Sequence, residues 1–188
     1  MLFDYLKSET EQLHKLTEDA AYNNRLGRDT ITHAEYAQLL RANLTIVAPL
    51  EATLAQFAAL PHPFYTSYCD RMRSTQLQHD LSDMDVGHEI TEYTLPAIAT
   101  LPSAVGAMYV LEGSALGGLY IVKQLRSQLE LADLRHRFYT GRGRESGPLW
   151  RVLSQSADAL VVRDDYPEAL AGARVAFRHY IDCYQEML

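Results

Sequence analysis

The chain has 188 residues, of which 47% are hydrophobic and 22% charged, an ordinary composition for one globular domain with a sizeable core. Its formal charge of -7 argues against nucleic acid as the main partner, because phosphate binding requires a basic surface. Cys69 and Cys183 have neither metal-ligand spacing nor a disulfide framework, and the amino terminus lacks the apolar core of a signal sequence. We therefore expect a single cytoplasmic domain over residues 1–188.

Apolar residues recur at helical spacing, and no alternating strand pattern runs longer than a few residues, so the predicted fold class is all-α. In chain order, helices are expected over about residues 3–26, 32–57, 65–84, 101–131, 148–162 and 167–187. Residues 140–147 are expected to form a loop, and residues 85–96 carry no clear pattern.

Local signals support two of these helix starts and one irregularity. Thr30 or Thr32 can begin the second helix, and Glu35 stands where it completes a capping box with Thr32. Pro102 suits the first turn of the fourth helix. Pro49 should kink the second helix, because proline lacks the N–H that an internal position donates.

The apolar stretch "MYVLEGSALGGLYIV", residues 108–122, contains three glycines, each costing a helix about 0.5–1 kcal/mol relative to alanine. Gly113 and Gly117 lie one turn apart on the same helix face, with Ser114 and Gly118 beside them. This strip of bare backbone suits either a large flat ligand or a closely packed helix. The Gly117-Gly118 pair also permits a kink.

The same region nearly reaches the length of a membrane-spanning helix, over residues 104–122. Glu112 lies near its centre, where a carboxylate costs several kcal/mol in lipid. We therefore expect a core helix and no membrane association.

A polar stripe follows the first helix, formed by Lys7, Glu11, His14 and Glu18 at spacings of three and four residues. Such a stripe is usually a solvated face. Alternatively, His14 is a metal or haem ligand, Glu18 orients its second ring nitrogen, and Lys7 reaches an anionic group of the ligand. Glu11 and His14 also form a Glu-x-x-His half-motif, but its second copy is missing, which argues against a di-iron site.

Two segments together carry a family resemblance: "LKSETEQLHKLTEDA", residues 6–20, and "GAMYVLEGSALGGLYI", residues 106–121. They resemble the haem oxygenase family, particularly bacterial members, some of which supply biliverdin to bacteriophytochromes. The similarity extends through residues 35–51 and 147–153. It implies a multi-helix bundle that holds haem between a proximal helix and a kinked, glycine-bearing distal helix.

On the proximal side, the resemblance makes His14 the axial ligand of the haem iron, with Glu18 near it. Lys7 matches a basic position that contacts a haem propionate. Tyr109 and Arg151 are further candidates for contacts on the propionate side.

On the distal side, Gly113 and Gly117 match glycines whose backbone approaches the haem face, and Gly118 completes the flexible pair. The mammalian pattern has an aspartate and an arginine where this chain has Ser114 and Val110. The distal hydrogen-bond network must therefore be built differently, with Ser114, backbone groups and water as candidate donors.

The implied reaction opens haem to biliverdin with release of CO and ferrous iron, so haem is both substrate and prosthetic group. It consumes O₂ and needs electrons from outside, because the chain has no Gly-x-Gly-x-x-Gly nucleotide motif. A ferredoxin, a flavoprotein reductase or a small-molecule reductant is implied, and a bacteriophytochrome is a candidate recipient of biliverdin.

Two alternatives remain. A non-catalytic haem-binding or delivery protein would keep His14 without turning haem over. A related all-α protein acting on another small molecule, such as a thiamin-type pyrimidine, would need a nucleophilic cysteine in its cavity.

Overall fold

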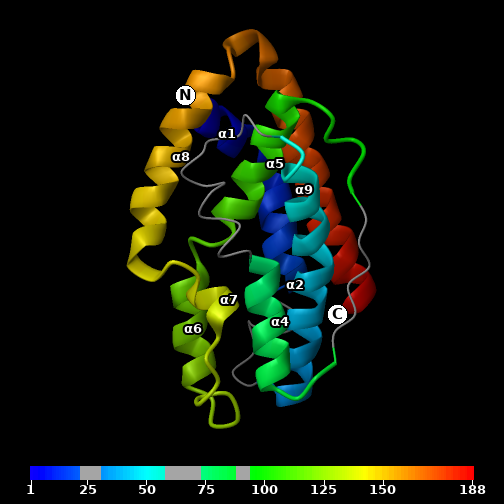
Figure 1. Ribbon diagram of the computed structural model, residues 1–188, viewed down its shortest axis with the longest axis vertical. Coiled ribbons are helices and arrows are strands. Elements are labelled where there is room, and N and C mark those ends of the chain that lie inside the picture. The colour runs from blue at the N-terminus through cyan, green and yellow to red at the C-terminus, as the bar shows by residue number, and fades with distance from the viewer. Residues whose placement is uncertain (22–30, 58–72, 88–93) are drawn as a thin grey trace.

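The computed structural model describes residues 1–21, 31–57, 73–87 and 94–188, and these residues form helices and turns with no strand. The expected all-α class is confirmed. Figure 1 shows an elongated bundle in which long helices run side by side. The helices are α1 (Leu2–Glu18), α2 (His33–Leu54), α4 (Arg73–Asp83), α5 (Leu101–Gly113), α6 (Gly118–Arg126), α7 (Arg137–Thr140), α8 (Ser146–Leu160) and α9 (Tyr166–Met187), with short 3-10 turns η2 (Gly143–Glu145) and η3 (Arg163–Asp165).

The start of α2 agrees with the sequence signal. The Thr32 hydroxyl accepts a hydrogen bond from the backbone N–H of Glu35, and the Glu35 carboxylate accepts from the backbone N–H of Thr32. This reciprocal capping box is confirmed. Pro49 lies inside α2, where Thr53 Oγ1 donates to its carbonyl oxygen at 2.7 Å. The kink expected at Pro49 stays a prediction.

Other boundaries differ in detail. α1 ends at Glu18 and a π-type turn follows over residues 19–21, whereas the rest of the expected first helix lies outside the described residues. The same holds for the first part of the third expected helix, which the structure describes from Arg73. The segment expected as a loop contains η2 and already ends at Ser146, where α8 begins.

The prediction of one continuous helix over 101–131 is wrong. α5 ends at Gly113, and α6 begins only at Gly118. In the turn between them, the N–H groups of Ala115 and Leu116 donate to carbonyls three residues earlier, where an α-helix would use those four residues earlier. The glycines weaken the helix, and its regular hydrogen bonding is interrupted between Gly113 and Gly118, where the sequence predicts a kink.

Close packing of α5 against α9 builds the core beside this break, and Figure 1 shows the two helices adjacent. A Cβ at Gly106 of α5 would overlap the carbonyl oxygen of Ala169, and a Cβ at Gly172 of α9 would overlap that of Ser103. The two backbones therefore touch through a glycine on each helix. This contact holds α5 close against α9.

One described stretch, Leu101–Arg126, is long and apolar enough to cross a membrane by length and composition. Half of its most apolar window is buried inside the protein, and the turn after Gly113 interrupts it. The interruption favours a helix of the bundle over one continuous span.

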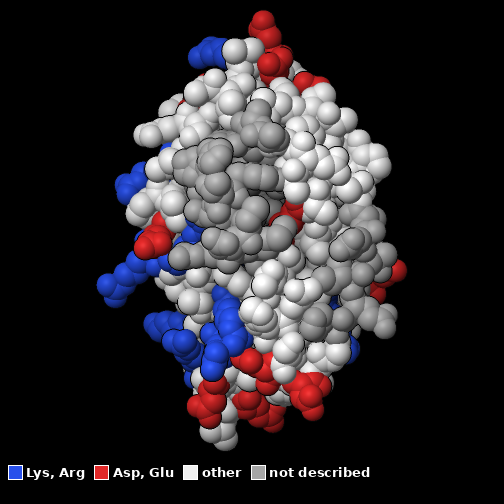
Figure 2. Space-filling view, in the orientation of Figure 1, with Lys and Arg blue, Asp and Glu red and all other residues white. Residues whose placement is uncertain are grey.

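Charged side chains are unevenly distributed over the face shown in Figure 2. Lys and Arg gather along one edge and on the lower half, and Asp and Glu gather at the lower tip. No field of a single sign covers this face.

Candidate functional site

A cavity of about 720 Å³ lies among α1, the α5–α6 break, and parts of α2, α4, α7, α8 and α9. Its volume falls within the range of sites that enclose small molecules or cofactors, roughly 300–1,000 Å³. The structure thus brings the two conspicuous motifs of the sequence to one cavity.

The polar stripe of α1 forms one wall of this cavity, with Lys7, Glu11, His14 and Glu18 all among the lining residues. His14 Nδ1 lies 3.6 Å from Glu18 Oε2, and the two side chains are 61% and 57% exposed. The ring of His14 also contacts Phe177 of α9 edge to face, with centroids 6.1 Å apart. Because Nδ1 faces the carboxylate, Nε2 is the ring nitrogen left for a ligand.

The carboxyl-terminal half of α5 and the break form another wall. Tyr109, Val110, Gly113, Ser114 and Gly117 line the cavity there. A Cβ at Gly113 would lie 3.4 Å from the Trp150 ring, whereas a Cβ at Gly117 would meet no atom within 4 Å. Gly117 is therefore the glycine that leaves open space.

Two predicted site residues are not brought to the cavity. Gly118 is buried and absent from the lining, because its backbone packs against the carbonyl of Tyr139, which a Cβ would overlap. Arg151 is exposed and also absent from the lining, whereas its neighbour Trp150 faces the cavity. The helical register of α8 explains this, since consecutive residues on a helix point about 100° apart.

Tyr109, a predicted site residue, lines the cavity beside Trp150 of α8, which the sequence prediction missed. Their ring centroids lie 5.6 Å apart, and Phe3 of α1, which does not line the cavity, contacts the rings of Trp150 and Tyr109 at 4.8 and 5.0 Å. Burial raises the pKa of Tyr109, and its hydrogen bond with Thr10 opposes that shift. No spacing within one segment could identify this cluster, because three helices contribute to it.

The sequence analysis also did not identify a hydrogen-bonded network of polar side chains at the cavity. Asn43 of α2 donates from Nδ2 to the hydroxyl of Tyr139 at 3.3 Å, and the hydroxyl of Tyr184 donates to Asn43 Oδ1 at 2.9 Å. All three residues line the cavity. Asn43 is a polar residue among mostly apolar buried residues of α2, which is the signal the sequence offers for it.

Arg73 is a further lining residue that sequence reasoning missed. It is only 8% exposed, and its guanidinium carbon lies 4.4 Å from the centre of the Phe138 ring. Its Nη1 donates to the carbonyl oxygen of Leu111 and to Ser114 Oγ, both at 2.7 Å. A buried cation thus reaches the end of α5.

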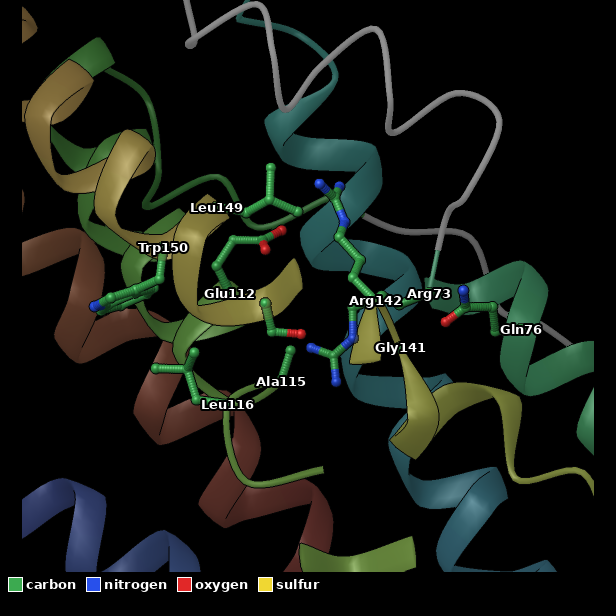
Figure 3. A pocket seen from close by; sticks show the side chains of 10 residues that line it. Arg73, Gln76, Glu112, Ala115, Leu116, Gly141, Arg142, Leu149 and Trp150 are labelled. Carbon is green, nitrogen blue, oxygen red and sulfur yellow. The ribbon is translucent and has the colours of Figure 1, made fainter. Parts of the chain in front are cut away.

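Behind this wall lies a second, smaller cavity of about 30 Å³, roughly the room of one water molecule. Arg73, Glu112 and Arg142 surround it, and Figure 3 shows their side chains around the small space. Burial raises the pKa of Glu112 from 4.5 to about 7, with the charge of Arg142 opposing that rise. A carboxyl group with a raised pKa therefore directly precedes Gly113.

The donor set suits a ligand that brings its own metal. Among the residues that the structure describes, no group of three or more His, Cys, Asp and Glu side chains could hold a metal ion. His14, the one histidine among the described lining residues, fits haem together with the nearby Lys7 and the open space at Gly117, because the porphyrin supplies the other iron ligands.

A cysteine-based site receives no support from the described part of the chain. Burial raises the pKa of Cys183 to about 11, which disfavours the reactive thiolate, and this residue does not line the cavity. Cys69 lies outside the described residues.

Comparisons with known proteins agree with this geometry. The family model described as heme oxygenase matches residues 1–186. A heme oxygenase of Xanthomonas campestris pv. campestris (strain 8004) is 31% identical over 163 residues, which is 84% of this chain and 93% of that protein.

Two solved structures share the fold. The NO- and CO-bound heme oxygenase of Neisseria meningitidis aligns with a TM-score of 0.75 and 20% identity, over 100% of this chain and 92% of its own. Heme oxygenase-1 of the cyanobacterium Synechocystis sp. PCC6803, in complex with heme, aligns with a TM-score of 0.77 and 17% identity, over 98% and 91%. From the match along nearly its whole length, this chain belongs to the haem oxygenase family.

Proposed function

We infer that this protein is a haem oxygenase that opens haem to biliverdin with release of CO and ferrous iron, and we propose that the 720 Å³ cavity is where it does so. One observation carries the site: His14 and Gly117, from distant parts of the sequence, line the same cavity. His14 provides an imidazole that can bind iron, and Gly117 leaves space for a ligand.

On the α1 side, His14 would bind the haem iron through Nε2, while Glu18 at Nδ1 and the ring of Phe177 orient the imidazole. Lys7 lies two turns earlier on the same lined face and would meet a propionate. Tyr109 is a second candidate for the propionate side.

On the distal side, Gly117 leaves open space and Gly113 places no side chain between α5 and Trp150, so this wall would leave room for O₂ beside the haem. Haem, when bound, supplies the iron at which O₂ is activated and the carbon skeleton that is oxidised. The Ser114 hydroxyl lies at this wall, where its oxygen can accept a hydrogen bond. Gly118 contributes by packing α6 against α7, outside the cavity.

Electrons would come from a separate ferredoxin, flavoprotein reductase or small-molecule reductant, because the sequence lacks a Gly-x-Gly-x-x-Gly nucleotide motif. We place the reaction in the cytoplasm, and a bacteriophytochrome is a candidate recipient of the biliverdin.

Purified protein is mixed with one equivalent of haemin and then given ascorbate or a ferredoxin system in air. The proposal expects a histidine-type Soret band that decays while the broad red absorption of biliverdin grows. A Soret band that persists with a reductant shown to reduce the bound haem would identify a haem carrier. If no Soret change occurs, the cavity does not bind haem.

A further inference from the structure

We infer that Arg73 is the positioning residue of the distal wall: it fixes the break between α5 and α6 and holds a positive charge beside Ser114. This inference rests on the proposed haem site, since it concerns how that site is completed. Arg73 lines both the large cavity and the small one behind it.

Arg73 occupies a backbone group that the break releases. In a continuous helix, the carbonyl of Leu111 would accept from the N–H of Ala115. Here Ala115 donates instead to the carbonyl of Glu112. Arg73 Nη1 donates to the Leu111 oxygen at 2.7 Å, and a cation at this place also complements the negative end of the helix dipole.

The same guanidinium fixes the side chain that follows the glycine. Arg73 Nη1 donates to Ser114 Oγ at 2.7 Å, and Ser114 Oγ donates to the carbonyl of Leu111 at 2.8 Å. The hydroxyl of Tyr180 on α9 lies 3.3 Å from Ser114 Oγ. Because the serine proton is directed to Leu111, its oxygen is left to accept, from Arg73 and from Tyr180.

Arg73 is itself held by a buried carboxylate. Glu51 of α2 is 2% exposed and accepts hydrogen bonds from the backbone N–H groups of Arg73 at 2.7 Å and Ser74 at 3.2 Å, and from the Ser74 hydroxyl. Glu51 thus holds the backbone of Arg73 and Ser74, and the ring of Phe138 supports the guanidinium from α7.

The guanidinium of Arg73 has a hydrogen-bond donor that is not used within the described residues. Within the described parts of the chain, Arg73 Nε has no hydrogen-bond partner although the side chain is buried. A buried donor without a partner is costly, typically about 1–3 kcal/mol, so its retention favours a role beyond folding. The wall has an apolar Val110 and a neutral Ser114, and Arg73 brings to it the positive charge that neither provides.

The test compares Arg73→Met, which removes the charge at similar length, with Arg73→Lys, which keeps it. Each variant is loaded with haem, reduced and bound to CO, and the C–O stretching frequency is measured by infrared spectroscopy. A positive charge near CO strengthens back-donation from the iron and lowers this frequency. Biliverdin formation and thermal unfolding of the haem-free protein are measured in parallel.

Arg137→Met is the matched control, because Arg137 also binds α4, through Asp80 and Asp83, but lines neither cavity.

We expect Arg73→Met to keep a histidine-type Soret band, raise the CO frequency and lower turnover by about 100-fold, the lower end of the range for loss of one preorganised donor. Arg73→Lys should restore part of the CO frequency shift and part of the turnover. Arg137→Met should change neither the CO frequency nor the turnover. An unchanged CO frequency in Arg73→Met would restrict Arg73 to a structural role and overturn the inference.

If Arg73→Met does not fold, Ser114→Ala decides, since Ser114 is exposed and its loss removes the hydroxyl through which Arg73 acts. This variant should show a smaller rise in CO frequency and a fall in turnover, and no change in either would refute the inference. Failure of the proposed function looks different, because wild-type protein itself would then give no Soret band, or a Soret band that persists with a reductant that reduces the bound haem.

Discussion

The ring of His14 meets the ring of Phe177 edge to face, at a centroid distance of 6.1 Å and an interplanar angle of 76°. Phe177 is buried in α9, whereas His14 lies on the exposed side of α1 and lines the cavity. With Glu18 Oε2 at 3.6 Å from Nδ1, the imidazole has a contact on its ring and another on one nitrogen. This arrangement orients the side chain before any ligand arrives.

His14→Ala should abolish the histidine-type Soret spectrum of the ferric haem complex, because it removes the proposed axial ligand. Absorption spectra during haemin titration measure this. His79→Ala is the control, since His79 is an exposed histidine on α4 that does not line the cavity. An unchanged spectrum in His14→Ala would mean that another group binds the iron.

Gly117 and Gly118 are adjacent but should respond in opposite ways. Gly117→Leu points into open space, so we expect turnover to fall about 100-fold through misplaced substrate, with unfolding free energy changed by less than about 1 kcal/mol. Gly118→Ala drives a Cβ into the carbonyl of Tyr139 and should destabilise the protein by about 1–3 kcal/mol. Biliverdin assays and urea denaturation separate the two. Undiminished turnover in Gly117→Leu would show that this face does not approach haem.

Glu112 should make stability depend on pH. Its pKa is raised by burial from 4.5 to about 7, so between these values the folded protein binds more protons than the unfolded chain, and stability falls as pH rises. Glu112→Gln should therefore gain about 1–3 kcal/mol relative to wild type between pH 4.5 and 7.5. Urea denaturation at both pH values checks this, with exposed Glu145→Gln as control. If the difference in unfolding free energy between Glu112→Gln and wild type is the same at both pH values, the prediction is wrong.

Lys7→Gln should weaken haem binding by up to about fivefold, the range of an exposed ion pair. The loss should shrink at high salt, because screening already weakens the wild-type interaction. Haemin titrations at low and high ionic strength measure both effects. Lys15→Gln is the matched control, since Lys15 lies on the same helix outside the cavity lining. Equal losses in the two variants would mean that only net charge matters.

Several features of the fold could be predicted from the sequence because they depend on neighbouring residues. Thr32 and Glu35 form their capping box within one turn, and the final helices lie within two residues of their expected bounds. The stripe containing His14 could be identified, although only the fold shows that it faces a cavity. The break after Gly113 was predicted only as a kink, since a glycine pair weakens a helix without setting its path.

By itself, the sequence determined the helices, the histidine stripe and the glycine-bearing segment, because periodicity, capping and backbone freedom act over a few residues. Tertiary structure decided which glycine does what: Gly117 faces open space, while Gly118 packs against Tyr139. It also brought Arg73 to the end of α5 and turned Arg151 away from the cavity. These outcomes depend on which backbones and side chains from distant segments meet, and no local pattern encodes such contacts.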